Sequence, residues 1–415
     1  MFETDTALSI KAAVLKALDR AGCVSTSDIA NLFSVASLNP DLILPILFFF
    51  RNNKESLQSF PLSQVHLISY IAHNDPIVRS VSIELACSFD SANYSNEEIQ
   101  RIIRLHMQDP HFRVREASYS AMLRIMGQGK SIDVAVYQSC LLGISDDFWR
   151  VREKALTLAF KLAQQNLEVA FDNDFCVKDH SFLAICEMAT DSEIRLRELA
   201  FQYLGQYENV NPEILLKTLF KQTLVHKDSS TETEAISPAF GTFVQGLEDE
   251  FYKVRLAAIH AMTNLSLYNR EFALLSLDFL VDMFNDDIFE VRVVGVESAT
   301  KIATIYEIQL NLDDLETILG NLEDADLGIR TKTRKLLRHV KLACTDGMKL
   351  LINTMKQEIK AYSMDIVSIF ECVSAVAKNH SEMICELFDV LFVFDRRYLI
   401  SVPSLKNNYC KIDLL

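Results

Sequence analysis

Hydrophobic positions recur every three or four residues along most of the chain, which is the spacing of an amphipathic helix. After Val254, apolar residues follow at offsets of 3, 4, 7, 8 and 11 positions. Nearly the same series follows Leu196 and Val78. Each series places one apolar stripe along one face of a helix, so the pattern predicts helices that bury this face against neighbours.

A polar phrase recurs at the start of these helices. An Asp is followed six positions later by an Arg that comes directly after a branched aliphatic residue, and a shorter form at Asp75 and Arg79 precedes the full ones. The Asp falls where we expect a helix N-cap, with Pro at the first helical position after Asp75 and Asp109. The six full pairs are Asp109 and Arg115, Asp146 and Arg152, Asp191 and Arg197, Asp249 and Arg255, Asp286 and Arg292, and Asp324 and Arg330.

The spacing of these arginines indicates the fold. From Arg79 to Arg330, successive arginines are 36, 37, 45, 58, 37 and 38 residues apart. A period near 37 is typical of two-helix solenoid repeats, which stack because one repeat cannot bury its own stripe. Spacing and residues resemble HEAT repeats. The resemblance implies an all-α fold, a HEAT-repeat α-solenoid (a superhelix of antiparallel helix pairs), in which the Asp and Arg residues form ladders between repeats.

The two longest intervals indicate insertions, and they divide the chain into parts. The 58-residue interval contains a polar stretch rich in Ser and Thr without an apolar stripe, which predicts a flexible insertion at 225–239. We expect divergent N-terminal capping repeats over 1–70 and a first sub-array over 71–224. A second sub-array is expected over 240–344, followed by divergent C-terminal helices and a frayed end over 345–415.

Composition limits the classes of function. The 415 residues include 11 Gly and 8 Pro, too few for a turn-rich β-sandwich or a Gly-looped nucleotide enzyme. The net charge of −15 argues against a general nucleic-acid coat, and no DNA binding is predicted. The longest apolar run, at 42–50, is far shorter than the roughly 20 residues of a membrane span, so no membrane contact is expected. Nine cysteines without a CxxC pair favour free buried thiols over disulfides or a zinc site.

No catalytic or cofactor motif is supported by the residues. Gly129-Lys130-Ser131 imitates the end of a phosphate-binding loop, but Arg124 stands where the first glycine of that motif belongs, so an interhelical turn is favoured. The histidines form no HExxH or HxxxH pair, and none is followed by Glu. This excludes the metal motif of the HEAT-repeat iron hydroxylases. We therefore expect no enzymatic activity, no cofactor and no metal.

One basic cluster stands out in this acidic chain, between positions 329 and 349. Arg330, Arg334 and Arg338 recur every four residues and so line one helix face. Two interpretations stay open: a face that is solvated or paired with the acidic neighbouring repeat, which is favoured, and a contact for RNA, phosphate or an acidic partner. The candidate contact residues are Arg330, Lys332, Arg334, Lys335, Arg338 and Lys341.

The aromatic residues Phe148 and Trp149 lie in the turn before a repeat helix. Aromatic side chains in such positions can anchor a bound protein. More often they pack onto the next repeat, and packing is the interpretation favoured here.

Several stretches resemble one family of HEAT-repeat proteins more closely than the repeats alone require. The runs Gly241–Met262 and Leu280–Arg292 resemble the Integrator complex subunit 4 family, as do Asp109–Ile125, Tyr137–Arg152 and Ala184–Gly205. The similar stretches occur in the same order as in the family, with a polar insertion just before Gly241.

The resemblance implies a nuclear, non-catalytic scaffold subunit of the Integrator complex. Its implied partners are other Integrator subunits, especially a pair of metallo-β-lactamase-fold endonucleases. The assembly acts on nascent RNA polymerase II transcripts, in small nuclear RNA 3′-end processing and transcription attenuation. RNA contact is expected to be indirect or local. Family members are longer and carry a C-terminal domain, which we expect this chain to lack. An importin-like or coat-adaptor-like transport scaffold and a phosphatase-type scaffold are the alternatives.

Overall fold

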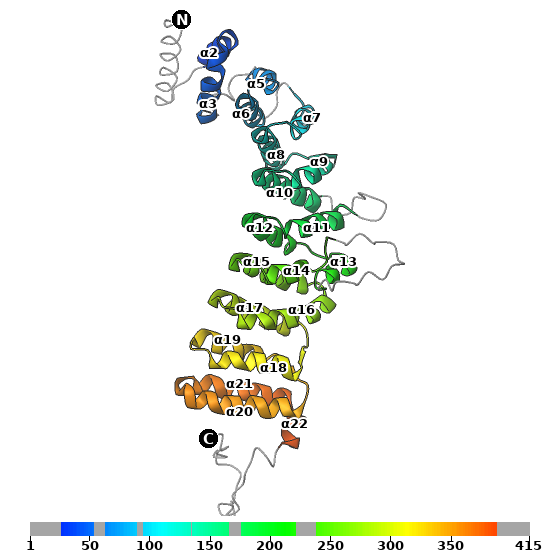
Figure 1. Ribbon diagram of the computed structural model, residues 1–415, viewed down its shortest axis with the longest axis vertical. Coiled ribbons are helices and arrows are strands. Elements are labelled where there is room, and N and C mark those ends of the chain that lie inside the picture. The colour runs from blue at the N-terminus through cyan, green and yellow to red at the C-terminus, as the bar shows by residue number, and fades with distance from the viewer. Residues whose placement is uncertain are drawn as a thin grey trace, which may run out of the picture. The chain divides into compact units, whose positions relative to one another are not determined.

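The computed structural model of the chain describes residues 26–53, 63–88, 94–133, 135–165, 176–220 and 238–387. Most of these residues lie in helices joined by short turns (Figure 1), so the predicted all-α fold is confirmed. The chain forms two compact units, Met1–Ser181 and Phe182–Leu415. Each unit is described by itself.

In the first unit, each helix that carries the arginine phrase packs against the helix before it and against the phrase helices of neighbouring repeats. The pairs are α5 (Ser63–Ile71) with α6 (Pro76–Ala86), α7 (Asn96–His106) with α8 (Phe112–Gly127), and α9 (Ala135–Ile144) with α10 (Trp149–Gln165). The phrase helices α6, α8 and α10 stack in that order. The preceding elements are α2 (Thr26–Leu38), η1 (Pro40–Leu42) and α3 (Ile43–Asn52), of which α3 packs on α6.

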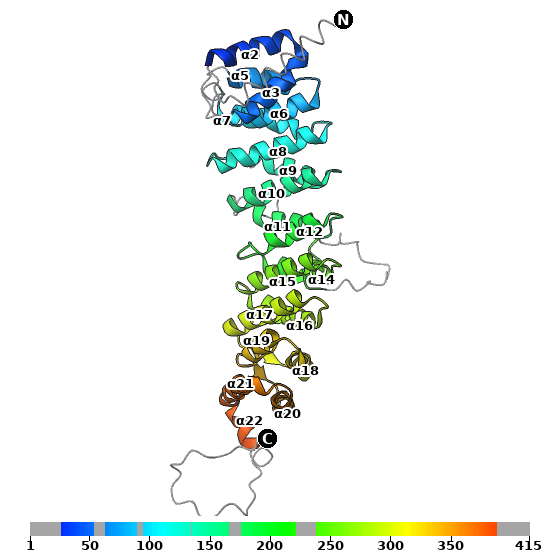
Figure 2. The same cartoon turned by 90° about the vertical axis from the view of Figure 1, so that its left-hand side faces the viewer.

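The second unit has two layers of helices, which Figure 2 shows from the side. The phrase helices and the last repeat form one layer: α12 (Ile194–Leu204), α15 (Tyr252–Ser266), α17 (Phe289–Ile305), α19 (Leu327–Leu337) and α21 (Ile366–Asn379). The other layer contains α13 (Pro212–Lys217), α14 (Thr242–Leu247), α16 (Arg270–Asp282), α18 (Leu312–Gly320) and α20 (Thr345–Ala361). The remaining helices are α11 (Val177–Met188), which spans the division between the units, η2 (Met283–Asn285), η3 (Asn321–Glu323), η4 (Ser363–Asp365) and α22 (Ser381–Glu386).

The apolar stripes form the core of these layers. In α15, Val254, Ala258 and Met262 are fully buried, as the spacing predicts. Two short strands, β1 (Gln309–Leu310) and β2 (Lys341–Leu342), pair in parallel beside α20. They join the turns that precede α18 and α20, and they leave the fold all-helical in class.

The predicted insertion lies between α13 and α14, and residues 225–237 of it are outside the described residues. Its flanks are held together, because the N–H groups of Gly241 and Phe243 donate to the carbonyls of Lys217 and Thr218, both at 3.1 Å. Gly241 has a φ of 68°, a conformation that favours glycine. The phrase helices α12 and α15 pack on each other across the insertion. The stack therefore continues past it, and the division between the units lies elsewhere, within α11.

The aspartates of the full phrase are not helix N-caps, which corrects the expectation from sequence. The N-cap of α8 is His111, two residues after Asp109, so Pro110 precedes the helix. Asp109 Oδ1 instead accepts a hydrogen bond from the His111 N–H at 2.8 Å, and the other five aspartates make the same bond two residues ahead. This side-chain turn keeps the carboxylate outside the helix, where it faces the preceding repeat. Asp75, of the shorter phrase, is an N-cap.

Candidate functional site

Each repeat arginine first holds the turn that precedes its own helix. Arg115 Nη1 donates to the carbonyls of Asp109 and Pro110, at 2.9 and 3.1 Å. The corresponding bonds are present at Arg79, Arg152, Arg197, Arg255, Arg292 and Arg330. Because Nη1 is used in this way, Nε and Nη2 of the same guanidinium point toward the next repeat.

The free edge of the guanidinium then pairs with the Asp of the next repeat. Arg115 Nε and Nη2 donate to the two carboxylate oxygens of Asp146, at 2.6 and 2.8 Å. Bidentate pairs of this kind are stronger than single contacts. Bidentate pairs also join Arg79 with Asp109, Arg197 with Asp249, and Arg255 with Asp286. Arg292 makes one 3.3 Å bond to Asp324, and Arg330 Nε donates to Asp365.

Two residues of these pairs, Asp109 and Arg115, have a shifted pKa. Partial burial acts to raise the pKa of Asp109, but hydrogen bonds from Arg79 and from the His111 N–H outweigh it, so the pKa lies below its ordinary value. The hydrogen bond to Asp146 raises the pKa of Arg115. Both groups are therefore held in their charged forms.

Two residues of the predicted ladder lie in different units. Arg152, in α10 of the first unit, donates to the carbonyls of Asp146 and Asp147. Asp191, in the second unit, accepts from the Glu193 N–H before α12. Each residue thus stabilises the turn before the phrase helix of its own repeat, as the equivalent residues of the other repeats do.

Aromatic rings cover several of the ion pairs. The Arg115 guanidinium lies 5.9 Å from the ring centroid of Phe148, and that of Arg197 lies 5.7 Å from Phe251. These are cation–π distances. Phe148 also stacks on Phe112, with centroids 4.2 Å apart. Phe148 therefore packs between repeats while 44% of it stays exposed.

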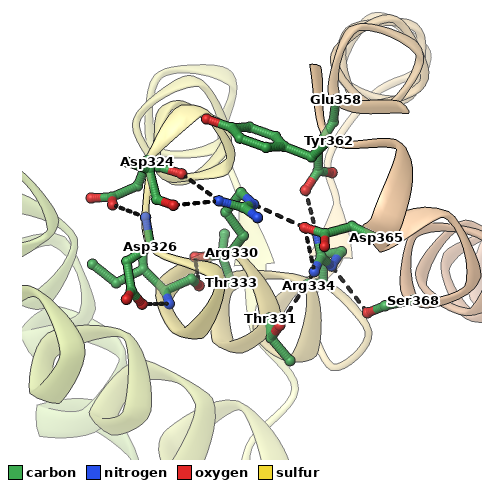
Figure 3. Close-up of polar contacts among 12 residues, drawn as sticks. Asp324, Asp326, Arg330, Thr331, Thr333, Arg334, Glu358, Tyr362, Asp365 and Ser368 are labelled. Carbon is green, nitrogen blue, oxygen red and sulfur yellow. Dashed lines mark hydrogen bonds and ion pairs between the residues drawn. The ribbon is translucent and has the colours of Figure 1, made fainter. Parts of the chain in front are cut away.

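The basic helix α19 is part of a buried charge network, the α19 cluster, which consists of Arg330, Arg334, Glu358, Tyr362 and Asp365 (Figure 3). Asp365 Oδ2 accepts from Arg330 at 2.9 Å and from Arg334 at 3.3 Å. Arg334 also pairs with Glu358, and its Nε donates to Ser368 Oγ at 3.1 Å. The Tyr362 ring lies over Arg330, and its centroid is 3.7 Å from the guanidinium carbon of Arg330. The cluster thus joins α19 to α20 and α21.

The α19 cluster balances two guanidinium groups against two carboxylates, and all four side chains are buried. The Arg334 side chain has no exposed surface, and that of Glu358 is 1% exposed. Burial raises the pKa of Glu358, and the charge of Arg334 opposes this shift. Burial also raises the pKa of Cys372 to about 11, and its thiol donates to the Arg334 carbonyl. The arrangement can hold helices together, and it offers no accessible group for chemistry.

The less favoured of the two interpretations, a contact for RNA, phosphate or an acidic partner, does not fit the burial of Arg330 and Arg334. Their four-residue spacing does place them on one helix face, but this face packs on the next repeat rather than meeting solvent. Arg338 lies 3.2 Å from Glu371, and Lys332 lies 3.5 Å from Glu297. Lys341 Nζ donates to the Asn379 carbonyl, and Lys335 is exposed. Most of the basic residues between positions 329 and 349 are therefore paired with acidic or carbonyl groups of the chain itself.

Sequence reasoning missed Asp365 and Glu358. The other pairs within continuous repeats join residues 30 to 32 positions apart, whereas Asp365 follows Arg330 by 35 and lacks the Val-Arg sequence of the phrase. An interval of 30 to 32 residues after Arg330 would place the acidic partner a few positions before Asp365. The interval alone therefore predicts a partner in this region but not the residue itself. Glu358 lies inside α20 and has no sequence signal.

Two grooves between consecutive phrase helices are the candidate partner-binding surfaces. One lies between α6 and α8 in the first unit, with a volume of about 460 Å³. The other lies between α12 and α15 in the second unit, with a volume of about 700 Å³ and polar residues such as Glu198, Gln202 and Lys253 along its sides. At its floor the helices approach closely, because a Cβ atom on Gly205 would lie 2.7 Å from Ala261 Cα.

The described ranges contain no group of three or more His, Cys, Asp or Glu side chains arranged to hold a metal ion. Within the same ranges, every helix is too short or too polar to cross a bilayer.

The stacked helix pairs, the inter-repeat arginine pairs and the grooves on the phrase helices define a HEAT-repeat α-solenoid, a class whose extended surfaces bind other proteins. No family model matches the sequence. The chain is 30% identical to Integrator complex subunit 4 of Mus musculus and of Homo sapiens over an alignment 346 residues long, which covers 74% of this chain and 36% of each relative. The suspected resemblance to Integrator complex subunit 4 is thus confirmed, and the chain spans about a third of the length of these curated relatives.

A solved structure supports the fold class independently. A crystal structure of importin beta superposes on the chain with a TM-score of 0.50, at 12% sequence identity, covering 88% of this chain and 57% of that chain. Identity this low shows the shared fold and carries nothing about function.

Proposed function

We propose that this chain acts in the nucleus as a non-catalytic scaffold segment of the Integrator complex. The observation that carries the proposal is the 30% identity to Integrator complex subunit 4 along 74% of the chain. A chance likeness among solenoids would follow the repeat phrase alone, whereas the stretches that resemble the family include α14 and the last residues of α16, outside the phrase helices.

The chemistry of the repeats fits a scaffold. The arginines that stand out in the sequence are engaged by carboxylates and carbonyls of the chain itself, so they stabilise the stack. The grooves between phrase helices stay open for partners. A scaffold of this kind contributes to a reaction by positioning other subunits.

The finer part of the proposal concerns the partners. We infer that the chain helps hold the pair of metallo-β-lactamase-fold endonucleases that cut nascent RNA polymerase II transcripts, in small nuclear RNA 3′-end processing and transcription attenuation. Direct RNA contact has little support, because the chain carries a net charge of −15 and the basic helix α19 is largely paired internally. The importin beta likeness shows the fold alone, so it does not favour a transport scaffold.

A binding experiment with purified proteins tests this part. The chain is mixed with the purified endonuclease pair at micromolar concentration, and the mixture is run on analytical size exclusion. The proposal predicts co-elution with the pair and no co-elution with a purified phosphatase catalytic subunit. Separate elution of chain and endonucleases would contradict the proposed partners. Co-elution with the phosphatase subunit instead would support the phosphatase-scaffold alternative.

A further inference from the structure

The groove between α6 and α8 is bordered by an unusual number of arginines for so acidic a chain. Arg51 comes from α3, Arg113 and Arg124 from α8, and Arg150 from α10. Two glutamates, Glu84 and Glu116, also line the groove, which leaves an excess of two positive charges. Small residues such as Ser80, Ala117 and Ala121 also line the groove, which has a volume of about 460 Å³.

The four arginines differ in what engages them. Arg51 and Arg124 both make polar contacts with other residues of the chain. Arg51 Nε lies 3.2 Å from Glu84 Oε2, and Arg124 Nη1 donates to the Glu84 carbonyl and to Ser88 Oγ. Arg113 and Arg150 are exposed, and within the described part of the chain no carboxylate pairs with either of them.

Aromatic rings hold these two arginines in place instead. The Arg113 guanidinium lies 5.9 Å from the Phe112 ring centroid, and that of Arg150 lies 5.4 Å from the Trp149 ring. Phe112 lines the groove and stacks on the half-exposed Phe148. The groove therefore offers two unpaired guanidinium groups beside an apolar edge, a combination that is typical of protein-binding hot spots.

We propose that this arginine–aromatic groove, defined by Arg113, Arg150, Phe112 and Phe148, binds an acidic segment of a partner protein. Carboxylates of the segment pair with Arg113 and Arg150, and an apolar side chain between them packs on Phe112 and Phe148. The inference does not depend on the Integrator assignment, because it rests on charge complementarity at the groove itself.

A peptide fits this groove better than RNA does. Glu116 lies within the groove, where a continuous phosphate backbone meets like charge, whereas a peptide has N–H groups to donate to it. The net charge of −15 also repels a long polyanion more than a short acidic segment. The α12–α15 groove has no comparable surplus of arginine, so the two grooves are expected to differ in what they bind.

The test uses a short fluorescent peptide in which Glu and Asp alternate with Phe and Leu. Its binding to the full chain is followed by fluorescence anisotropy at low salt. A peptide with Gln and Asn in place of the acids and a single-stranded oligouridine are measured beside it. The groove variant is Arg113→Glu with Arg150→Glu. The matched control is Arg101→Glu with Arg104→Glu, which reverses two exposed arginines of α7 in the same unit.

We expect the acidic peptide to bind the wild-type chain and to lose affinity by about tenfold or more in the groove variant, with little change in the control. Binding should weaken as salt rises, because exposed charges are screened. The proposal is overturned if the acidic peptide binds no better than the amide peptide, if both double variants lose affinity equally, or if oligouridine binds more tightly than the peptide. Circular dichroism checks that both variants are folded, and Arg113→Gln with Arg150→Gln provides a milder variant with the same expected direction.

Discussion

At the scale of single residues, several repeat arginines make three kinds of contact at once. Arg197 donates to two carbonyls of its own turn, pairs with Asp249 of the next repeat through two nitrogens, and lies beside the Phe251 ring. A lysine has one charged nitrogen and cannot reproduce this geometry. The repeat arginines are therefore expected to stabilise the stack rather than recognise a partner.

The first prediction compares two ion pairs between repeats that differ in their hydrogen-bond geometry. Arg255 and Asp286 form a bidentate pair with side chains only 13% and 8% exposed. We expect Arg255→Ala to lower the free energy of unfolding by about 2–4 kcal/mol, because it leaves Asp286 without its partner. Arg255→Lys should recover only part of the loss. Arg292 makes a single, longer bond to Asp324, and we expect Arg292→Ala to cost less. Urea unfolding measures both, and equal losses would contradict the account.

The second prediction concerns acid. In the folded chain the pKa of Asp109 lies below its ordinary value, so the unfolded chain binds a proton there first as the pH falls. The Arg79–Asp109 ion pair makes its full contribution to the free energy of unfolding above the ordinary pKa of an aspartate, about 3.9. This contribution is lost as the pH falls through the lower pKa of the folded chain. The stability difference between wild type and Asp109→Asn should therefore be largest near neutral pH and shrink in acid. Urea unfolding over a pH series measures it, with the exposed Asp147→Asn as a charge control. A difference that stays constant with pH would argue against the ion pair.

At the scale of helices, the α19 cluster shows how charged groups can lie inside a solenoid. Arg330 and Arg334 of α19 meet Glu358 of α20 and Asp365 of η4, and the charges balance. Removing one member leaves an unpaired buried charge, which is costly, whereas removing a matched pair is not. Balance rather than net attraction is what keeps this junction stable.

The third prediction follows from that balance. Arg334→Leu should lower the free energy of unfolding by about 3–5 kcal/mol, because Glu358 and Asp365 then share one guanidinium. Arg334→Leu combined with Glu358→Leu should recover most of the loss, because Arg330 and Asp365 remain paired. Hydrogen exchange of α19–α21 locates the effect. If the double variant were no more stable than the single one, the cluster would not be a balanced pair.

The fourth prediction tests how closely phrase helices approach. Gly205→Ala places a Cβ atom 2.7 Å from Ala261 Cα, a backbone atom that cannot move without shifting α15. We expect a loss of about 1–3 kcal/mol from overpacking. Gly127→Ala is the matched control, because a Cβ atom there meets nothing within 4 Å, and it should be neutral or slightly stabilising. Thermal unfolding of the two variants compares them directly.

Periodicity predicts these elements well but does not say which neighbour covers a given face. The offsets after Val254 correctly mark the buried side of α15. The same reasoning puts Arg330, Arg334 and Arg338 on one face of α19, yet the burial of Arg334 depends on Glu358 and Asp365, which lie 24 and 31 residues away. The true N-caps were missed because each Asp accepts from the N–H two residues ahead and its turn is held by the arginine of its own helix, contacts that spacing alone does not reveal. The arginines of the α6–α8 groove come from helices far apart in sequence, so no local pattern marks the groove.

At the scale of the whole molecule, the repeats determine a class of protein and the relatives narrow it. Paired arginines, apolar stripes and open grooves describe a HEAT-repeat scaffold, and such a scaffold on its own fits many assemblies. The likeness to Integrator complex subunit 4 extends over 74% of the chain, and it is the basis for the role proposed above. On that proposal, we expect the chain to assemble with Integrator subunits.

The most direct test is affinity purification of the tagged full chain from nuclear extract, with quantitative mass spectrometry. An extract carrying the tag alone provides the background. We expect Integrator subunits, including the endonuclease pair, to be the most enriched proteins. Enrichment of transport cargo, coat components or a phosphatase catalytic subunit, with Integrator subunits at background, would contradict it.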